Sequence, residues 1–261
     1  MSRVFITGSS DGLGLLAGKL LAEQGHAVTL HARSEPRAAD AKRALPAAER
    51  VLVGDVSTLA GMRAVAEQAN AAGAFDAVIH NVGVGDQQPR TDTADGLEHV
   101  FATNVLAPYV LTALVKPPKR LVYLSSGMHR GGKPDLRDPQ WKSRRWNGAQ
   151  AYSDSKLFDV VLAFAVARRW PGVLSNAVDP GWVPTKMGGP RAPDDLPLGA
   201  ATQVWLAVSE DKAAKASGDY FHHQRLREPH IASTDPEVQG ALLAYCESIS
   251  GVAISTPQEL K

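Results

Sequence analysis

The stretch Val4-Phe5-Ile6-Thr7-Gly8-Ser9-Ser10-Asp11-Gly12-Leu13-Gly14 decides the fold, because a short apolar strand pattern runs through a glycine-rich loop into a helical pattern. Small residues let backbone N–H groups approach an anion at the N-terminus of a helix. A tight turn that binds no ligand is the alternative, but such a turn needs only one or two glycines. The three glycines here favour a nucleotide site after the first strand.

The rest of the chain alternates short apolar β-branched runs with longer Ala- and Leu-rich helical patterns, which is typical of a parallel sheet with crossover helices. We expect strands at 4–6, 27–31, 51–53, 77–80, 121–125, 174–178 and near 220–222. We expect helices at about 12–24, 35–45, 58–72, 93–115 with a break, 152–168, 199–209 and 235–248. These elements predict an α/β fold: a single Rossmann-type domain over residues 1–261, with a doubly wound, seven-stranded parallel sheet and helices on both faces.

Composition excludes several classes of protein. Lys and Arg total 28 against 27 for Asp and Glu, so no net field attracts nucleic acid or anionic membranes. Cys246 is the single cysteine, which excludes an intramolecular disulfide and fits a reducing compartment. No signal-peptide core or membrane-length apolar run is found. We therefore expect a soluble, cytoplasmic protein with neither nucleic acid nor membrane as a partner.

Polar and glycine residues follow several of the predicted strands, where ligands bind in open parallel sheets. Asp55 follows the third strand, Asn81-Val82-Gly83 the fourth, Ser125-Ser126 the fifth and Asp179-Pro180-Gly181 the sixth. Loop starts are often polar by chance, but chance does not predict glycine clusters after both the first and the fourth strands. These side chains are expected to meet at one edge of the sheet.

Tyr152 and Lys156 are four residues apart in a helical pattern, so both side chains share one helix face. A phenol has an unperturbed pKa of about 10, and a neighbouring cation favours its ionised form. The pair alone more often indicates packing than catalysis. Its interpretation depends on the other motifs of the chain.

The spacing Thr-Gly-x-x-x-Gly-x-Gly at 7–14, together with Asp55, Asn81-x-Gly83 and Tyr-x-x-x-Lys, resembles the short-chain dehydrogenase/reductase family over nearly the whole chain. The resemblance implies a nicotinamide dinucleotide cofactor, with Asp55 at the adenine and Thr185 at the carboxamide. It implies these cofactor-binding residues: Thr7, Gly8, Ser10, Gly12, Leu13, Gly14, Arg33, Asp55, Val56, Asn81, Gly83, Tyr152, Lys156, Pro180, Gly181, Val183 and Thr185.

The resemblance also implies a catalytic set. Tyr152 is the expected general acid/base, and Lys156 tunes it and binds the nicotinamide ribose. Ser126 is the expected partner of the substrate oxygen, with Ser125 as a strand-end residue. Asn104 is the fourth member, because Pro108 has no N–H and leaves the Asn104 carbonyl without its helical donor. A plain proline kink is the alternative at this position.

Cofactor choice is expected at the end of the second strand, where NAD-preferring sequences place an acid. Ala32 stands there instead, and Arg33 beside it is suited to a 2′-phosphate. We therefore expect NADP(H) to be preferred, with NAD(H) as a possible cofactor. Asp11 occupies the family's other basic position and opposes a phosphate by its charge.

Several positions depart from the family pattern. His80 and Val82 replace an Asn and an Ala beside Asn81, and Asp154 replaces an Ala and is expected to face solvent. No metal is expected, because His129, His222 and His223 are poorly spaced for ligation.

Two long loops, at about 127–150 and 180–198, are expected to choose the substrate. The first resembles retinol-dehydrogenase-like members, and its Met128, Trp141 and Trp146 suggest an apolar pocket. Its several basic residues are expected to form a solvated face.

The sequence thus predicts an NADP-dependent oxidoreductase of small-molecule carbonyls or alcohols, and the resemblance implies a homodimer or homotetramer. A reductase of activated C=C bonds and a dinucleotide-sensing protein without turnover are the alternatives.

Overall fold

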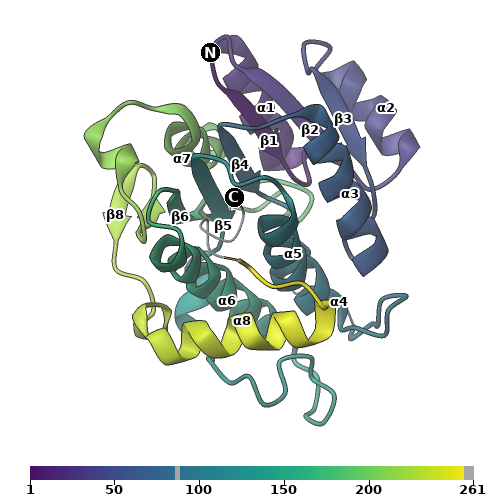
Figure 1. The fold of residues 1–261 in the computed structure, drawn as a ribbon, viewed down its shortest axis with the longest axis vertical. Coiled ribbons are helices and arrows are strands. Elements are labelled where there is room, and N and C mark those ends of the chain that lie inside the picture. Colours follow the sequence, from purple (N-terminus) through teal and green to yellow (C-terminus); the bar gives the residue numbers. More distant parts are fainter. Residues whose placement is uncertain (86–88, 256–261) are drawn as a thin grey trace.

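The computed structural model describes residues 1–85 and 89–255. In this part of the chain one sheet has the strand order β3-β2-β1-β4-β5-β6-β7-β8 (Figure 1). The strands are β1 (Arg3–Ile6), β2 (Ala27–Ala32), β3 (Arg50–Val53), β4 (Ala77–His80), β5 (Arg120–Leu124), β6 (Leu174–Asp179), β7 (Tyr220–His222) and β8 (Arg225–Arg227). The α/β Rossmann-type prediction is confirmed.

The predicted strand number was wrong by one. β8 pairs with β7 in an antiparallel hairpin, so the sheet has eight strands and its last pair is not parallel. His223 and Gln224 form the connecting turn with φ of 48° and 60°. Such turns normally carry Asn or Gly, and the exposed strand Arg225–Arg227 lacks apolar alternation. The sequence therefore gave no signal for this hairpin.

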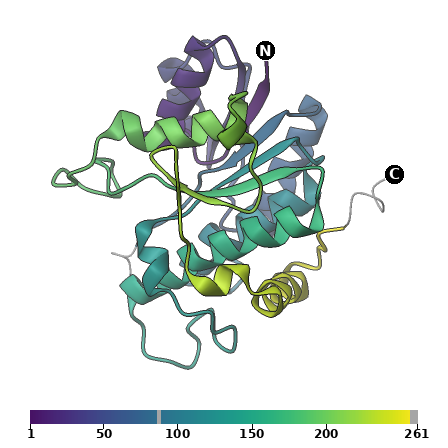
Figure 2. The ribbon, with the colours of Figure 1, turned by 90° about the vertical axis from the view of Figure 1, so that its left-hand side faces the viewer.

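Helices cover both faces of the sheet. They are α1 (Gly12–Glu23), α2 (Glu35–Ala44), α3 (Leu59–Ala72), α4 (His99–Phe101), α5 (Ala107–Leu114), α6 (Gly148–Arg169), α7 (Leu196–Val208) and α8 (Pro236–Ser250). Buried side chains of α1, α2 and α7 share one apolar cluster with the sheet, and those of α3, α5, α6 and α8 share the other. Figure 2 shows α7 and α6 on opposite sides of the strands. The two clusters make the fold doubly wound.

The strand order reverses between β1 and β4, because β1 continues to β2 on one side and pairs with β4 on the other. In such sheets the crevice for a ligand lies at the carboxyl ends of the two central strands. Here those ends carry the glycine loop and Asn81.

The predicted break within 93–115 is present. Between α4 and α5 the chain forms one π-helical segment, η1 (Ala102–Leu106), which contains Asn104. Pro108 cannot donate to the Asn104 carbonyl, so a regular α-helix cannot pass through this position. The wider turn brings the buried Asn104 side chain towards the end of β4.

Within residues 1–85 and 89–255 no helix combines the length and the apolar character needed to cross a membrane.

Candidate active site

A cavity of about 700 Å³ lies at the carboxyl ends of the central strands. Most of the predicted cofactor-binding residues line it: Gly8, Ser10, Gly12, Leu13, Arg33, Asp55, Val56, Asn81, Gly83, Tyr152, Lys156, Pro180 and Thr185. Thr7, Gly14, Asn104, Ser126, Gly181 and Val183 are not among its lining residues. Segments far apart in the sequence therefore meet around one space, although part of the predicted set lies behind or beside it.

Thr7 and Gly14 lie behind the cavity wall and connect β1 with β4. The Thr7 hydroxyl accepts hydrogen bonds from the backbone of Asn81 and Val82 at 3.0 and 3.1 Å. The Asn81 amide donates to the carbonyls of Thr7 and Gly8 at 3.0 and 2.9 Å. A Cβ on Gly14 would lie 2.4 Å from that amide nitrogen, so glycine is required there. These contacts fix the shape of the glycine loop.

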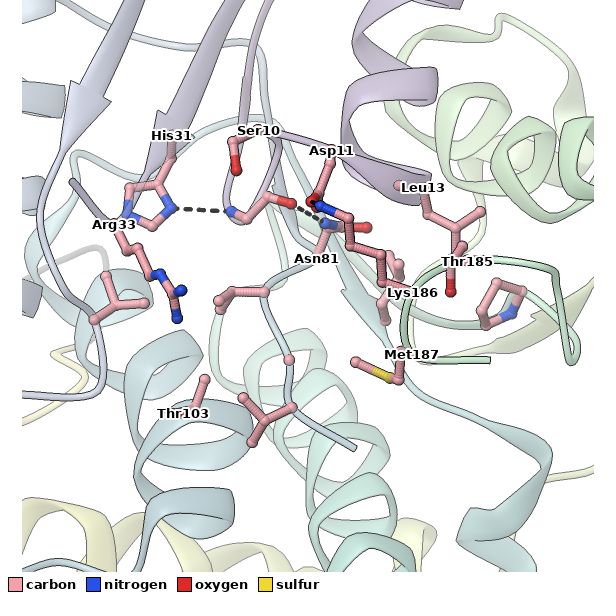
Figure 3. A pocket seen from close by; sticks show the side chains of 18 of the residues that line it. Ser10, Asp11, Leu13, His31, Arg33, Asn81, Thr103, Thr185, Lys186 and Met187 are labelled. Carbon is pink, nitrogen blue, oxygen red and sulfur yellow. Dashed lines mark hydrogen bonds and ion pairs between the residues drawn. The ribbon is translucent and has the colours of Figure 1, made fainter. Parts of the chain in front are cut away.

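His31 also fixes the position of the glycine loop, a role that was not predicted from the sequence. Its Nδ1 lies 2.9 Å from the Gly8 backbone nitrogen, and its Nε2 lies 2.9 Å from the Gly54 carbonyl (Figure 3). Both contacts are satisfied by a neutral ring that accepts from Gly8 and donates to Gly54. Burial lowers the pKa of His31, although the Gly54 bond and Asp55 act in the opposite direction. In the sequence, a histidine at the end of an apolar strand pattern could have indicated this role.

The N-terminus of α1 is suited to an anion. No side chain caps the helix and its first turn has no acid, so its first N–H groups face the cavity region without an internal side-chain acceptor. Asp11 precedes it, but its carboxylate accepts from Arg37 at 2.6 Å and from Lys186 at 2.8 Å. Burial alone would raise the pKa of Asp11, and these two bonds lower it. The opposing charge expected at Asp11 is thus compensated.

Two arginines stand at the β2 side of the cavity. Arg33 is exposed and points into the space (Figure 3). Arg37, from α2, also lines the cavity and donates to the Ser10 hydroxyl at 3.0 Å. Arg37 was not predicted from the sequence, because its position within a helix carries no motif.

Tyr152 and Lys156 lie in the first half of α6, which starts at Gly148 and is capped by the Asn147 side chain. The Lys156 ammonium lies 5.7 Å from the centre of the Tyr152 ring. It donates to the Leu124 carbonyl and to the Asp159 carboxylate, both at 2.8 Å. Burial disfavours this ammonium, but Asp159 and Tyr152 outweigh burial and raise the pKa of Lys156. Lys156 is therefore a cation at neutral pH.

Asn104 braces the wall next to Lys156. Its amide donates to the Ser155 hydroxyl at 3.0 Å and to the Val84 carbonyl at 3.1 Å, and its oxygen accepts from the Val84 backbone at 2.8 Å. A Cβ built on Gly83 would lie 3.5 Å from the Asn104 oxygen and 3.6 Å from Lys156 Nζ. Gly83 thus lies between the two predicted catalytic groups.

The two serines after β5 differ in what their hydroxyls do. Ser125 donates to the Lys156 carbonyl at 2.7 Å and is buried, so its hydroxyl hydrogen is committed inside the protein. The Ser126 hydroxyl accepts from the Met128 backbone at 3.2 Å, and Ser126 does not line the cavity, whereas Ser125 does.

The two long loops lie differently with respect to the cavity. Thr185, Lys186 and Met187 of the 180–198 loop line it on the side opposite Arg33 (Figure 3). Gly181 and Val183 belong to the same loop without lining the space, and Val183 is buried.

Residues of the 127–150 loop are absent from the lining of this cavity. Trp141 is instead 6% exposed, with Trp146 edge-on at 5.6 Å and the Arg144 guanidinium 3.8 Å above its ring. The aromatic pair packs within its own loop, so it does not supply the apolar pocket expected from the sequence.

Asp154 corrects another expectation, because it is buried rather than exposed to solvent. Its carboxylate accepts from the Lys133 backbone at 2.8 Å and from the Gln150 amide at 2.7 Å. The 127–150 loop folds over this face of α6, and the sequence does not reveal that cover.

Within the described ranges no group of three or more His, Cys, Asp or Glu side chains is arranged to hold a metal ion.

The chain is similar to known proteins. A family model described as short chain dehydrogenase matches residues 2–127. An uncharacterized oxidoreductase of Emericella nidulans is 44% identical, and the match covers 97% of this chain and 99% of that protein. A short-chain dehydrogenase of Penicillium rubens is 40% identical over 97% of this chain and 99% of its own length.

Retinol dehydrogenase 13 of Homo sapiens is 29% identical over 98% of this chain and 86% of its length, which agrees with the predicted likeness to retinol-dehydrogenase-like members. A crystal structure of an uncharacterized protein from Mycobacterium paratuberculosis superimposes with a TM-score of 0.83 at 26% identity, covering 98% of this chain and 95% of that one. The chain therefore belongs to the short-chain dehydrogenase/reductase family of oxidoreductases.

Proposed function

We propose that the chain is an NADP-dependent oxidoreductase that moves a hydride between the nicotinamide and the carbon of a small-molecule carbonyl or alcohol. The observation that supports this most is the shared cavity, which the glycine loop, Tyr152 and Lys156 all line. Because the loop and the pair are far apart in the sequence, at 7–14 and 152–156, a purely structural Tyr-Lys pair has no reason to face the loop.

The residues present fit a dinucleotide. A Cβ on Gly8 would lie 2.7 Å from the Val82 backbone, and the residue has a φ of 60°, so this turn of the loop requires glycine. The first N–H groups of α1 would bind the phosphates, and Asp55 and Val56, which line the cavity, would lie at the adenine. The cofactor, when bound, supplies the hydride chemistry, and the protein orients the substrate and moves one proton.

Tyr152 would donate the proton to the substrate oxygen in reduction and accept it in oxidation. Lys156 favours the ionised phenol through its charge and holds the nicotinamide ribose. The Ser126 hydroxyl would hydrogen-bond the substrate oxygen and stabilise its developing charge. Asn104 holds the wall beside Lys156.

A carbonyl and alcohol panel followed through NADPH absorbance tests this proposal. Tyr152→Phe removes the proton donor, and we expect turnover to fall by about 10²–10⁴-fold while NADPH still binds. Ser125→Ala is the matched control for Ser126→Ala, since the Ser125 hydroxyl donates to the Lys156 carbonyl inside the protein. Products reduced at C=C rather than C=O would favour the enone reductase. Tight NADPH binding with no turnover across the panel would favour a dinucleotide sensor.

The proposed preference for NADP over NAD rests on Arg33, directly after β2, and on Arg37 of α2, which both line the cavity. A hydrogen bond to a charged group contributes about 1.5–3 kcal/mol, so losing one contact to the 2′-phosphate costs about tenfold or more. We expect Arg33→Asp to lower the ratio of NADPH to NADH efficiency by at least that factor. An unchanged ratio in both Arg33→Asp and Arg37→Ala would overturn the proposed preference.

A further inference from the structure

Asp159 lies one turn after Lys156 on α6, and the two form a buried ion pair of 2.8 Å. Lys156 is 4% exposed and Asp159 is 3% exposed. The same ammonium donates to the Leu124 carbonyl at 2.8 Å. An ammonium carries three hydrogens, so two are fixed inside the protein and one remains for the cavity that Lys156 lines.

We propose that Asp159 is a positioning residue of the reaction, whose carboxylate fixes the Lys156 ammonium and offsets part of its charge at Tyr152. This inference rests on the proposed function, because it assigns a role to the residue behind the proposed proton-transfer pair.

The pair is poorly explained as a stabilising contact. Removing two charges from water costs several kcal/mol for each ion. A protein in which well-packed apolar residues replace such a buried pair is often as stable as the original, or more stable. Here the buried carboxylate instead lies against Lys156, which lines the cavity next to Tyr152. A carboxylate there holds the ammonium in a fixed place, as the reaction requires.

The two members act on each other's charge state. Burial raises the pKa of Asp159, while the attraction and hydrogen bond from Lys156 act in the opposite direction. Burial disfavours the Lys156 ammonium, but the attraction of Asp159 and Tyr152 raises its pKa. The ammonium that faces Tyr152 is therefore a cation with an anion directly behind it, and its effect on the phenol is weaker than that of an isolated lysine.

The titratable neighbours of the pair come from three elements. Tyr152 is on α6 itself. Tyr123 on β5 is buried, which is the main reason that its pKa is raised, and the Asp159 charge adds to the rise. His80 on β4 stacks on Tyr123 at 4.7 Å and is kept neutral by burial. None of these neighbours supplies a second cation, so in the described part of the chain the Asp159 charge is balanced by Lys156.

Phenolate absorbance measures the ionisation of Tyr152, and hence the effect of Asp159 on it, without any turnover. Burial raises the pKa of Tyr109, Tyr123, Tyr220 and Tyr245, so these four ionise only at strongly alkaline pH. The remaining tyrosine of the five is Tyr152, and subtraction of the Tyr152→Phe titration assigns its signal.

In Asp159→Asn the amide still accepts from the lysine, but the negative charge is gone. We expect the phenolate midpoint of Tyr152 to fall by about one pH unit, the effect of one nearby charge at an effective dielectric constant of about 20. The pH profile of kcat/KM for alcohol oxidation should shift in the same direction.

Asp154→Asn is the matched control, because Asp154 is also buried on α6 but binds the Lys133 backbone, the Gln150 amide and Arg144 instead of Lys156. It should leave the phenolate midpoint in place. Asp159→Ser removes the same charge in a smaller side chain and provides a second measurement if the Asn variant does not fold.

A midpoint that stays, or that rises, in the Asp159 variants overturns the role assigned to Asp159. Failure of the proposed function has a different signature. In that case the wild-type protein would turn over no carbonyl or alcohol, whereas the phenolate titration would still report on the pair.

Discussion

His80 is expected to make the protein sensitive to acid. The residue is 3% exposed, and burial lowers its pKa to about 3. An unfolded histidine has a pKa of about 6.5, so between these two values the unfolded chain binds one more proton than the folded chain. The free energy of unfolding therefore rises with pH in this window. The contribution of His80 is complete above about pH 6.5 and is lost as the pH falls towards 3.

The size of the effect follows from the two pKa values. Acidification from pH 7.5 to pH 5.0 spans about 1.5 pH units below the unfolded pKa of about 6.5, where the unfolded His80 binds a proton and the folded one does not. Each of these pH units changes the free energy of unfolding by about 1.4 kcal/mol. His80 alone should thus lower the free energy of unfolding by about 2 kcal/mol over this interval. Buried His31 and His129 have lowered pKa values as well, so only a difference between variants isolates His80.

Urea denaturation of the wild type and of His80→Gln at pH 7.5 and 5.0 measures that difference. The Gln amide can still reach the Thr112 hydroxyl, which lies 3.1 Å from His80 Nε2, but it does not titrate. The variant should lose about 2 kcal/mol less than the wild type on acidification. Thr112→Val is the control, since it removes the hydrogen bond and leaves the histidine, so its pH dependence should match the wild type. Equal losses in the wild type and in His80→Gln would refute the reasoning.

Four further substitutions have definite expected outcomes. Gly14→Ala inserts a Cβ 2.4 Å from the Asn81 amide, so NADPH affinity measured by calorimetry should fall by about tenfold or more. Gly240→Ala, in contrast, adds a Cβ into open space on α8, so the free energy of unfolding should rise by about 0.5–1 kcal/mol. Glu98→Ala leaves the N–H groups of Val100 and Phe101 without their 2.8 Å acceptor, and urea denaturation should show a loss of about 1–2 kcal/mol; no loss would mean that water replaces the cap. Lys186→Ala removes an exposed ion pair to Asp11, so NADPH affinity should change by at most about fivefold at low salt and not at all at high salt. A large change that does not depend on salt would show that Lys186 does more than form this ion pair.

The glycine loop, the parallel strands up to β7 and the Tyr-Lys pair were predictable because each has a local signature. Glycines that follow a strand, apolar runs of strand length, and a four-residue spacing can all be recognised in one stretch of sequence. The structure brings them together because parallel strands all deliver their carboxyl ends to one edge.

The residues that the sequence did not reveal act through contacts between distant segments. His31 reaches Gly8 and Gly54, 23 residues away in each direction, and Arg37 reaches Ser10 from a different helix. Asp159 has the i,i+3 spacing to Lys156, but that spacing is common on helices and nothing local shows that both side chains are buried. Trp141 was expected at the substrate because of its type, and tertiary packing within its own loop decided otherwise.

Asp11 departs from the family pattern, and its contacts in the structure change what this departure implies for cofactor choice. Its acidic side chain stands where the family has a base, which argued against a 2′-phosphate. In the structure Arg37 and Lys186 both bind that carboxylate, at 2.6 and 2.8 Å, so two cations surround one anion next to Ser10. Arg33 adds a third positive charge on the rim of the same cavity. The local balance is therefore positive at the point where a phosphate would lie, and the base missing from the glycine loop is supplied by α2. This balance makes Arg37, rather than position 11, the residue to test for cofactor choice beside Arg33.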